Sequence, residues 1–172
     1  MNSKLNKVSI ERFSRQIVLK DVGIIGQKKI ISSKVLVVGA GGLGSPATEF
    51  LSRAGVGVIG IVDNDKVSLS NLHRQSLYNN SDVGKFKVKI AKKNIKKINP
   101  NTEVKIYKIR LNNINFKEII NNYDYVVDGS DNFATKFLLN DFCLKYKKIL
   151  VSGAISKFDG HIFTFDFRNK KI

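Results

Sequence analysis

Short apolar runs alternate with longer amphipathic stretches along most of this chain. The apolar runs are rich in Val and Ile, which is typical of strands buried in a sheet. The stretches between them repeat apolar residues every three or four positions, which is typical of helices with one buried face. The sequence therefore predicts strands over 34–38, 56–63, 102–110, 123–131, 148–154 and 159–167, the last of them antiparallel.

Predicted helices separate these strands. They cover 41–54, 84–99, 116–121 and 132–146, and residues 11–31 form one or two further short helices. Strands that alternate with such helices build βαβ units, whose right-handed crossovers place helices on both faces of a parallel sheet. We therefore expect an α/β fold with a Rossmann-like, doubly wound, mainly parallel sheet. A single domain would cover 1–172, with a short N-terminal helical segment (1–33) before the core (34–172).

Apolar spacing also indicates which face of a helix is buried. In the helix over 41–54, one side carries Leu43, Ala47, Phe50, Leu51 and Ala54. In the helix over 84–99, most lysines gather on one side, but Lys87 falls in the middle of the apolar side. A buried ammonium without a partner is costly. We expect Lys87 to reach an anion over the carboxyl edge of the sheet, or alternatively to extend its stem to water past the helix end.

A glycine-rich turn joins the first predicted strand to the first core helix. Gly39, Gly41 and Gly44 have the spacing G-x-G-x-x-G, and Asp63 ends the next strand. Glycines let the backbone approach a phosphate at the helix N-terminus, and an acid at the second strand end accepts hydrogen bonds from ribose hydroxyls. The pattern predicts an adenine nucleotide. The alternative is that the glycines serve only the packing of helix on strand.

Further polar residues follow Asp63, in "VDNDKVSLSNLHRQ" (62–75). Asn71, Arg74 and Gln75 stand close together there, and a dinucleotide oxidoreductase would leave them unexplained. Asp131 follows the fourth strand at the same sheet edge, where it would cap the helix from 132 or hold a magnesium ion that bridges phosphates. Asp128 and Asp65 are further carboxylates nearby.

This inventory suits a magnesium-bound triphosphate better than a dinucleotide. Cleavage between the α and β phosphates needs cations to stabilise the departing pyrophosphate. No general base or nucleophile is evident in the sequence, which fits a reaction whose nucleophile comes with the substrate, such as a carboxylate that attacks the α-phosphate.

The formal net charge of the chain is +16 at pH 7, which suggests an anionic partner. Lysine is plentiful throughout, however, and no arginine-rich block carries interleaved aromatics, so nucleic acid is not the expected partner. No apolar run approaches the roughly 20 residues of a membrane span, and the start lacks the apolar middle of a signal peptide. We expect a cytoplasmic protein without a membrane partner. Cys143 sits at helical spacing from Leu139 and Tyr146, as a core residue would.

Several long motifs resemble a known family. They are "RFSRQIVL", "VLVVGAGGLGSPATEFLSRAGVGVIGIVDNDKVSLSNLHRQSLY", "VGKFKVKIAKKNIKKINP", "VVDGSDNFATKFLLN" and "VSGAISKFDGHIFTF", within residues 11–165. They resemble the adenylyltransferases that activate ubiquitin-like sulfur carriers for molybdopterin or thiamine-thiazole biosynthesis, which are relatives of the ubiquitin-activating enzymes. The resemblance implies that ATP, magnesium and the carrier's C-terminal Gly-Gly carboxylate form an acyl-adenylate and pyrophosphate.

The same resemblance assigns roles to single residues. It implies that the glycine turn, with the Gly42 backbone, faces the nucleotide and that Asp63 binds the ribose. Phosphate-binding and catalytic roles would fall to Arg74 and Lys87, and Asp131 would also hold the magnesium. Arg15 would reach the γ-phosphate of the neighbouring subunit in a homodimer. The remaining nucleotide contacts would be Ser70, Asn71, Leu72, His73, Gln75 and Asn132.

Members of this family usually continue beyond the point where this sequence ends, at Ile172. The continuation carries two C-x-x-C pairs that bind zinc, and the surface that grips the carrier. We therefore expect no zinc in this chain, a domain incomplete at its C-terminus, and an exposed edge strand. Three alternatives stay open: an ATP-dependent tRNA-modifying dehydratase of the cyclic threonylcarbamoyladenosine type, a non-catalytic nucleotide-binding or dimerisation module, and a dehydrogenase.

Overall fold

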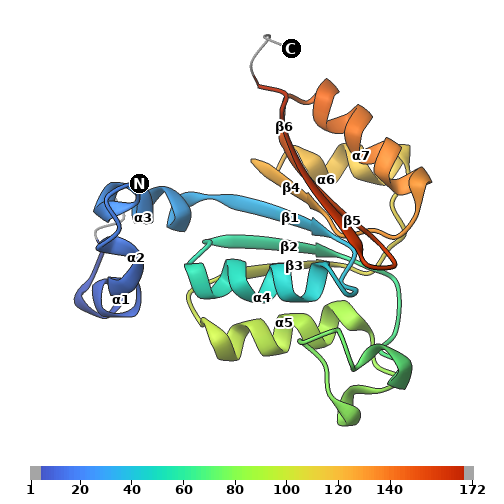
Figure 1. Cartoon of the computed structure of the whole chain (residues 1–172), viewed down its shortest axis with the longest axis horizontal. Coiled ribbons are helices and arrows are strands. Elements are labelled where there is room, and N and C mark those ends of the chain that lie inside the picture. Colours follow the sequence, from blue (N-terminus) through green and yellow to red (C-terminus); the bar gives the residue numbers. More distant parts are fainter. Residues whose placement is uncertain (1–4, 169–172) are drawn as a thin grey trace.

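The computed structural model describes residues 5–168 and contains a six-stranded sheet in the order β3-β2-β1-β4-β5-β6 (Figure 1). The strands are β1 (Lys34–Val38), β2 (Val58–Val62), β3 (Glu103–Tyr107), β4 (Tyr125–Asp128), β5 (Ile149–Ser156) and β6 (Asp159–Asp166). The first five pair in parallel, and β6 pairs antiparallel with β5, as predicted. Residues 1–4 and 169–172, which the sequence assigns to the same domain, lie outside the described residues.

The helices are α1 (Lys7–Arg12), α2 (Ser14–Ile17), α3 (Gly23–Ser32), α4 (Gly44–Ala54), α5 (Lys87–Ile98), α6 (Asn113–Ile120) and α7 (Phe133–Lys145). Two short 3-10 helices, η1 (Leu69–Asn71) and η2 (Asn80–Asp82), lie between β2 and α5. Residues 5–33 hold three helices rather than the one or two predicted. The helix expected from 84 begins at Lys87, because Gly84 has a φ of 83° and Phe86 pairs with Lys66 in an isolated bridge.

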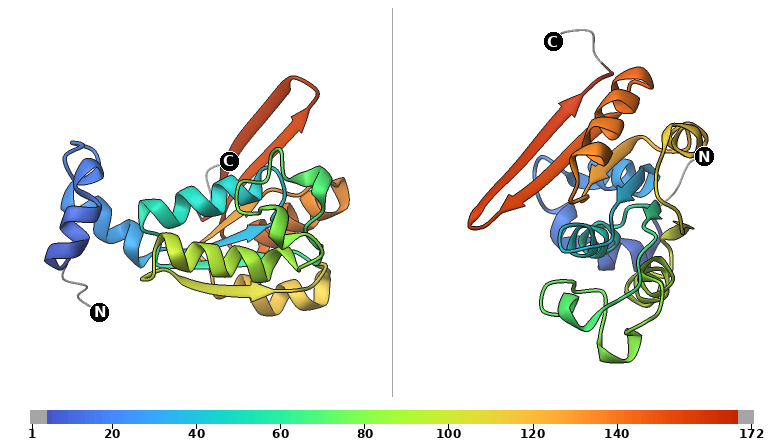
Figure 2. Two further views of the ribbon diagram at one scale, coloured as in Figure 1. Left: turned by 90° about the horizontal axis from the view of Figure 1, so that it is seen from below. Right: turned by 90° about the vertical axis from the view of Figure 1, so that its right-hand side faces the viewer.

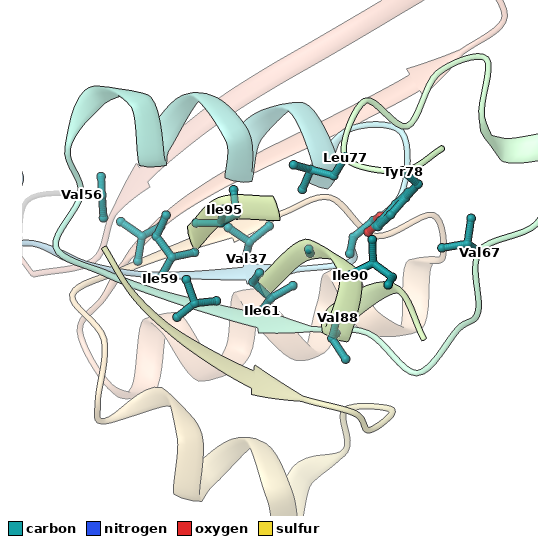
Figure 3. Packing of buried hydrophobic residues seen from close by; sticks show 14 residues of the cluster. Val37, Val56, Ile59, Ile61, Val67, Leu77, Tyr78, Val88, Ile90 and Ile95 are labelled. Atoms are coloured by element: carbon teal, nitrogen blue, oxygen red, sulfur yellow. The ribbon is translucent and has the colours of Figure 1, made fainter. Parts of the chain in front are cut away.

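Two apolar cores lie on opposite faces of the sheet, as a doubly wound fold requires. The helices α4 and α5 cover one face, where Val37, Ile59 and Ile61 pack against Val88 and Ile95 (Figure 3). The helices α6 and α7 cover the other, and their core residues are Leu36, Val126, Phe116, Ile120, Leu139 and Cys143. Figure 2 shows these layers from two further directions. The Rossmann-like α/β fold predicted from the sequence is confirmed.

One residue of the predicted buried side of α4 was placed wrongly. Phe50, placed on the buried side of α4 by apolar spacing, is 65% exposed. The residues of α4 that are buried are Gly44, Ser45, Thr48 and Ser52. These small side chains let α4 approach the sheet closely, and Leu51 of the predicted apolar side packs against the same core.

The strand order reverses between β1 and β4, because α4 follows β1 on one face and α7 follows β4 on the other. Crevices of this kind, at the carboxyl ends of the strands, are where ligands bind in open α/β sheets. Here the crevice is lined by backbone. A Cβ atom on Gly44 would lie 1.7 Å from the carbonyl oxygen of Gly39, and one on Gly129 would lie 2.9 Å from the nitrogen of Gly44.

The helices α1 to α3 lie beyond the amino ends of the strands, at the end of the sheet opposite the crevice (Figure 1). They are anchored on the last turn of α4, where the side-chain amides of Gln16 and Gln27 both donate to the carbonyl of Ala54. Phe13 is buried beneath Gly55.

The far side of the sheet ends in β6, every residue of which is exposed. Within the described part of the chain β6 has a neighbour on one side only, and its exposed side chains include Ile162, Phe163 and Phe165. This is the exposed edge strand that the sequence predicts. Across residues 5–168 no helix combines the length and the apolar character that crossing a membrane requires.

Cys143 is fully buried in the second core, as predicted. Burial raises the pKa of its thiol to about 12, so the group stays protonated at neutral pH. It acts as a small apolar residue in the packing of α7.

The close approach at Gly44 gives a direct test of the crevice. We expect Gly44→Ala to lower the free energy of unfolding by at least about 3 kcal/mol, since its methyl group would overlap backbone that cannot move aside. Denaturant unfolding followed by circular dichroism measures this. The matched control is Gly160→Ala, whose Cβ would be 3.9 Å from the nearest atom and should change stability by less than about 0.5 kcal/mol. Equal stability of the two variants would contradict the tight turn.

Candidate functional site

The residues that the sequence predicts as a site come from three segments at the crevice. The glycine turn joins β1 to α4, the segment after β2 carries Asp63 to Lys87, and the loop 129–132 joins β4 to α7. Contacts between the segments bring them together: Gly39 lies against Gly129 and Ser130, and Gly42 lies against Arg74. Most of the predicted residues therefore share one edge of the sheet.

Asp63 fixes the shape of the glycine turn. Its Oδ2 accepts a hydrogen bond of 2.8 Å from the backbone nitrogen of Ala40, and its Oδ1 accepts one of 2.7 Å from that of Asp65. The residue is half-buried. A carboxylate oxygen can accept two hydrogen bonds, so each oxygen retains capacity for a hydroxyl donor after bonding to the backbone.

Tyr78 is a second support of the turn, which the residue-by-residue analysis of the sequence missed. Its buried hydroxyl donates to the carbonyl of Ala40 at 2.9 Å. Burial raises the pKa of this phenol, and the negative charge of Asp63 raises it further, so Tyr78 remains a donor. The signal available in the sequence was its position at the end of the motif "SNLHRQSLY".

Arg74 lies directly over the glycine turn. A Cβ on Gly42 would be 3.3 Å from both Cδ and Nε of Arg74. One guanidinium nitrogen donates to the carbonyl of Ser70 at 3.3 Å and lies 2.8 Å from Nε2 of His73. Arg74 itself is exposed, and a guanidinium has five N–H donors. It therefore presents a positive charge beside the backbone that would face a phosphate.

Gln75 is buried beside the same turn, with an exposed fraction of 3%. Its Oε1 atom is buried without a hydrogen-bond partner, and its Nε2 lies 3.8 Å from the position of a Cβ on Gly41. A buried acceptor left unpaired costs free energy, and functional sites are one place where such groups occur.

The other predicted residues of this segment are less enclosed. Asn71 and Leu72 are half-buried, and Ser70 and His73 are exposed.

Lys87 is buried, as predicted, but its partner differs from the expected one. Its Nζ lies 3.0 Å from Oδ2 of Asp65, so the chain itself supplies the anion. Neither a bound anion nor an extended stem is needed to explain its burial. The Asp65 side chain is 63% exposed, so the ion pair opens towards solvent, and the ammonium has three donors of which this contact uses one.

Two acids at the loop 129–132, Asp128 just before it and Asp131 within it, have different surroundings. Asp128 is buried, and its carboxylate accepts from the nitrogen and hydroxyl of Ser130, the hydroxyl of Ser152 and the ammonium of Lys136. Asp131 is exposed, and it does not cap α7. That cap is Asn132, whose side chain accepts from the nitrogen of Thr135 at 2.9 Å.

Asp131 is consequently the acid of this loop that fits a magnesium ion. Its carboxylate has a single contact, at 3.4 Å from the amide of Asn132, whereas Asp128 is saturated. Residues 5–168 hold no group of three or more His, Cys, Asp or Glu side chains placed to ligate a metal. Magnesium is usually bound by one or two carboxylates together with water and phosphate oxygens, and the isolated Asp131 matches that arrangement.

Arg15 is not brought to this crevice. It is an exposed residue of α2, at the opposite end of the sheet (Figure 1). Within one subunit it is therefore separate from the other predicted residues, and a role across a dimer stays a prediction.

Comparison with known proteins now adds to this geometry. The profile of the ThiF family matches residues 13–171. The chain belongs to the ThiF family. A probable molybdopterin-synthase adenylyltransferase from Gracilaria tenuistipitata var. liui is 42% identical over 171 residues, which is 99% of this chain and 48% of the relative.

Other relatives of this ThiF-family chain have related names. A sulfur carrier protein adenylyltransferase from Thermus thermophilus is 46% identical over 159 residues, covering 92% of this chain and 59% of the relative. The chain thus spans about half the length of these curated relatives.

Solved structures give the same fold. The E. coli tRNA N6-threonylcarbamoyladenosine dehydratase, in complex with ATP, matches with a TM-score of 0.84 and 29% identity. It covers 91% of this chain and 65% of its own.

The two lysine–aspartate pairs of the site allow a matched stability test. We expect Lys87→Met to change the free energy of unfolding by less than about 1 kcal/mol, because the exposed Asp65 can be hydrated. Lys136→Met should lower it by about 3 kcal/mol, because it leaves Asp128 buried and unpaired. Chemical denaturation compares the two variants. A larger loss for Lys87→Met than for Lys136→Met would contradict this description of the pairs.

Proposed function

We propose that this chain binds ATP and magnesium at the crevice and transfers the adenylyl group to the C-terminal Gly-Gly carboxylate of a ubiquitin-like sulfur carrier. The products would be an acyl-adenylate and pyrophosphate. The observation that carries the proposal is that Arg74 lies against the glycine turn, at the sheet edge where the segment with Lys87 and the loop with the uncommitted Asp131 also lie. The names of the relatives support the reaction class.

The residues present fit a nucleotide at each part of the site. Asp63 retains acceptor capacity for ribose hydroxyls, and the glycine turn leaves its backbone open to phosphate. No side chain caps the N-terminus of α4, so the helix end favours an anion. Arg74 and Lys87 supply positive charge, and Gln75 offers an unpaired acceptor. Asn71 and Asn132 would complete the polar contacts.

Charge stabilisation is the main chemical contribution of these residues. The substrate carboxylate would attack the α-phosphate, the bond between the α and β phosphates would break, and pyrophosphate would leave. Arg74 and Lys87 would offset the negative charge that develops on the leaving group. Magnesium, held by Asp131 when bound, would supply further positive charge to the phosphates. No protein nucleophile is needed, and the protonated Cys143 thiol offers none.

The sulfur carrier is the proposed partner, and its pathway would be molybdopterin or thiamine-thiazole biosynthesis. The name of the Gracilaria relative favours molybdopterin.

A second candidate is the activation of a carboxylate on a modified tRNA base. The likeness to the E. coli tRNA dehydratase and the charge of +16 favour it. The relatives at 42% and 46% identity favour the carrier instead.

ATP–pyrophosphate exchange tests the proposed reaction. We expect exchange with a ubiquitin-like carrier ending in Gly-Gly, and about a hundredfold less with Asp131→Ala, because the carboxylate that would hold the charge-stabilising magnesium is lost. Asp141→Ala is the control, since it removes an exposed acid of α7 away from the loop.

Other outcomes of this assay would contradict the proposal. Exchange that depends on tRNA in place of the carrier would favour the tRNA-modifying function. ATP binding without exchange would favour a non-catalytic module, and binding of NAD without ATP would favour a dehydrogenase.

The proposed homodimer has its own test, because Arg15 would serve the neighbouring subunit. We expect Arg15→Ala and Asp131→Ala each to have little exchange activity when alone. Mixing the two in equal amounts should restore about a quarter of the activity, since half of the dimers would then hold one intact site of two. No recovery after subunit exchange, checked by native mass spectrometry, would show that Arg15 does not act across a dimer.

A further inference from the structure

A partly buried ion pair joins the two elements on either side of the loop that carries Asp131, β4 and α7. Nζ of Lys136 is 2.9 Å from Oδ2 of Asp128, and the exposed fractions of the two side chains are 21% and 1%. The same ammonium donates to the carbonyl of Gly153 at 2.8 Å. Lys136 was not singled out by the sequence, and Asp128 was named there, with Asp65, only as a further carboxylate near Asp131.

Lys136 occupies a position that helix electrostatics disfavour. It lies in the opening turns of α7, where the helix dipole favours negative charge. A lysine there needs a compensating partner, and the partly buried ammonium has Asp128. Because apolar residues of similar volume often replace a buried ion pair without loss of stability, stability alone does not explain the pair.

The contacts of Asp128 show what the pair holds in place. Its Oδ1 accepts from the nitrogen and hydroxyl of Ser130, at 3.0 and 2.6 Å. Its Oδ2 accepts from Lys136 of α7 and from the hydroxyl of Ser152 of β5, the latter at 2.8 Å. One carboxylate therefore ties the loop to a helix and to a neighbouring strand.

Asp131 stands between two anchored residues. Ser130 before it is bound to Asp128, and Asn132 after it is fixed as the cap of α7. Its own carboxylate has one contact of 3.4 Å, so its direction is set by the backbone on either side. The geometry of this loop thus depends on the Asp128 carboxylate.

We propose that Asp128 and Lys136 are positioning residues, which hold Asp131 where it can bind the metal of a metal–nucleotide complex. This inference rests on the proposed function, because it assumes that Asp131 is the metal ligand. Asp128 itself has no role as a ligand: both its oxygens are committed to the protein, and it acts through the loop.

Nucleotide affinity measured with and without metal tests the proposal without any carrier. The probe is ATP, titrated calorimetrically in the presence of Mn²⁺ or of EDTA, and the readout is the ratio of the two dissociation constants. Asp131→Ala gives the ratio expected when the metal-binding carboxylate is absent. We call this ratio, the factor by which metal tightens ATP binding, the gain from metal. We expect Asp128→Asn to lower it by about tenfold, because loss of a group that orients a metal ligand has an effect of this size. Affinity in EDTA should stay within about twofold, because Asp128 does not touch the nucleotide.

Conservative variants separate positioning from mere support of the fold. Lys136→Arg keeps the ion pair and should retain the gain from metal. Ser130→Ala removes only the hydroxyl contact in the loop and should lower the gain from metal by about threefold. If Asp128→Asn does not fold, Ser130→Ala replaces it as the test of the proposal.

Three results would overturn the inference: a gain from metal equal to wild type in both Asp128→Asn and Ser130→Ala, an equal loss of affinity with and without metal, or no effect of Asp131→Ala. Absence of carrier-dependent exchange, with the gain from metal intact, would contradict the proposed reaction alone.

Discussion

The close contact of three backbone segments at the strand reversal is the constraint on which the crevice depends. Gly39, Gly44 and Gly129 lie so near one another that a single added methyl group would meet main-chain atoms. This contact sets the distance between the end of β1, the start of α4 and the loop after β4. It brings the glycine turn and the Asp131 loop to the same edge of the sheet, and the buried small residues of α4 maintain it.

Around this contact, the site is built from side chains that support the backbone and side chains that remain available. Asp63 and Tyr78 hold the turn through Ala40, and Asp128 holds the loop through Ser130. Arg74 and Asp131 retain unused hydrogen-bonding or ligand capacity. A division of this kind is expected where a protein must present charged groups in fixed directions, because each group that contacts a ligand needs another to orient it.

The sequence predicted the fold and the contributing segments well, because Val and Ile runs and the glycine spacing are local signals. It predicted Lys87 as a buried cation but not its partner, since Asp65 lies 22 positions away and is brought close only by the fold. The sequence offered Asp131 as the cap of α7 or as a magnesium ligand, and the cap is Asn132, because the boundary of a helix is uncertain by one residue in sequence. Phe50 was placed on the buried side of α4 and Ser45, Thr48 and Ser52 were not, since apolar spacing does not detect packing through Ser and Thr. The network of Asp128 joins residues from three elements, a combination that has no signature in a single segment.

The antiparallel ribbon of β5 and β6 carries a consequence for the behaviour of the protein in solution. The aromatic rings of His161, Phe163, Phe165 and, just beyond β6, Phe167 lie next to one another in succession, and within residues 5–168 no strand pairs with the outer edge of β6. An open strand with apolar side chains is a template on which further strands add. The large positive charge of the chain opposes such addition through mutual repulsion. Raising the ionic strength would screen that repulsion, so concentrated salt should favour the growth of ordered aggregates from this end of the sheet.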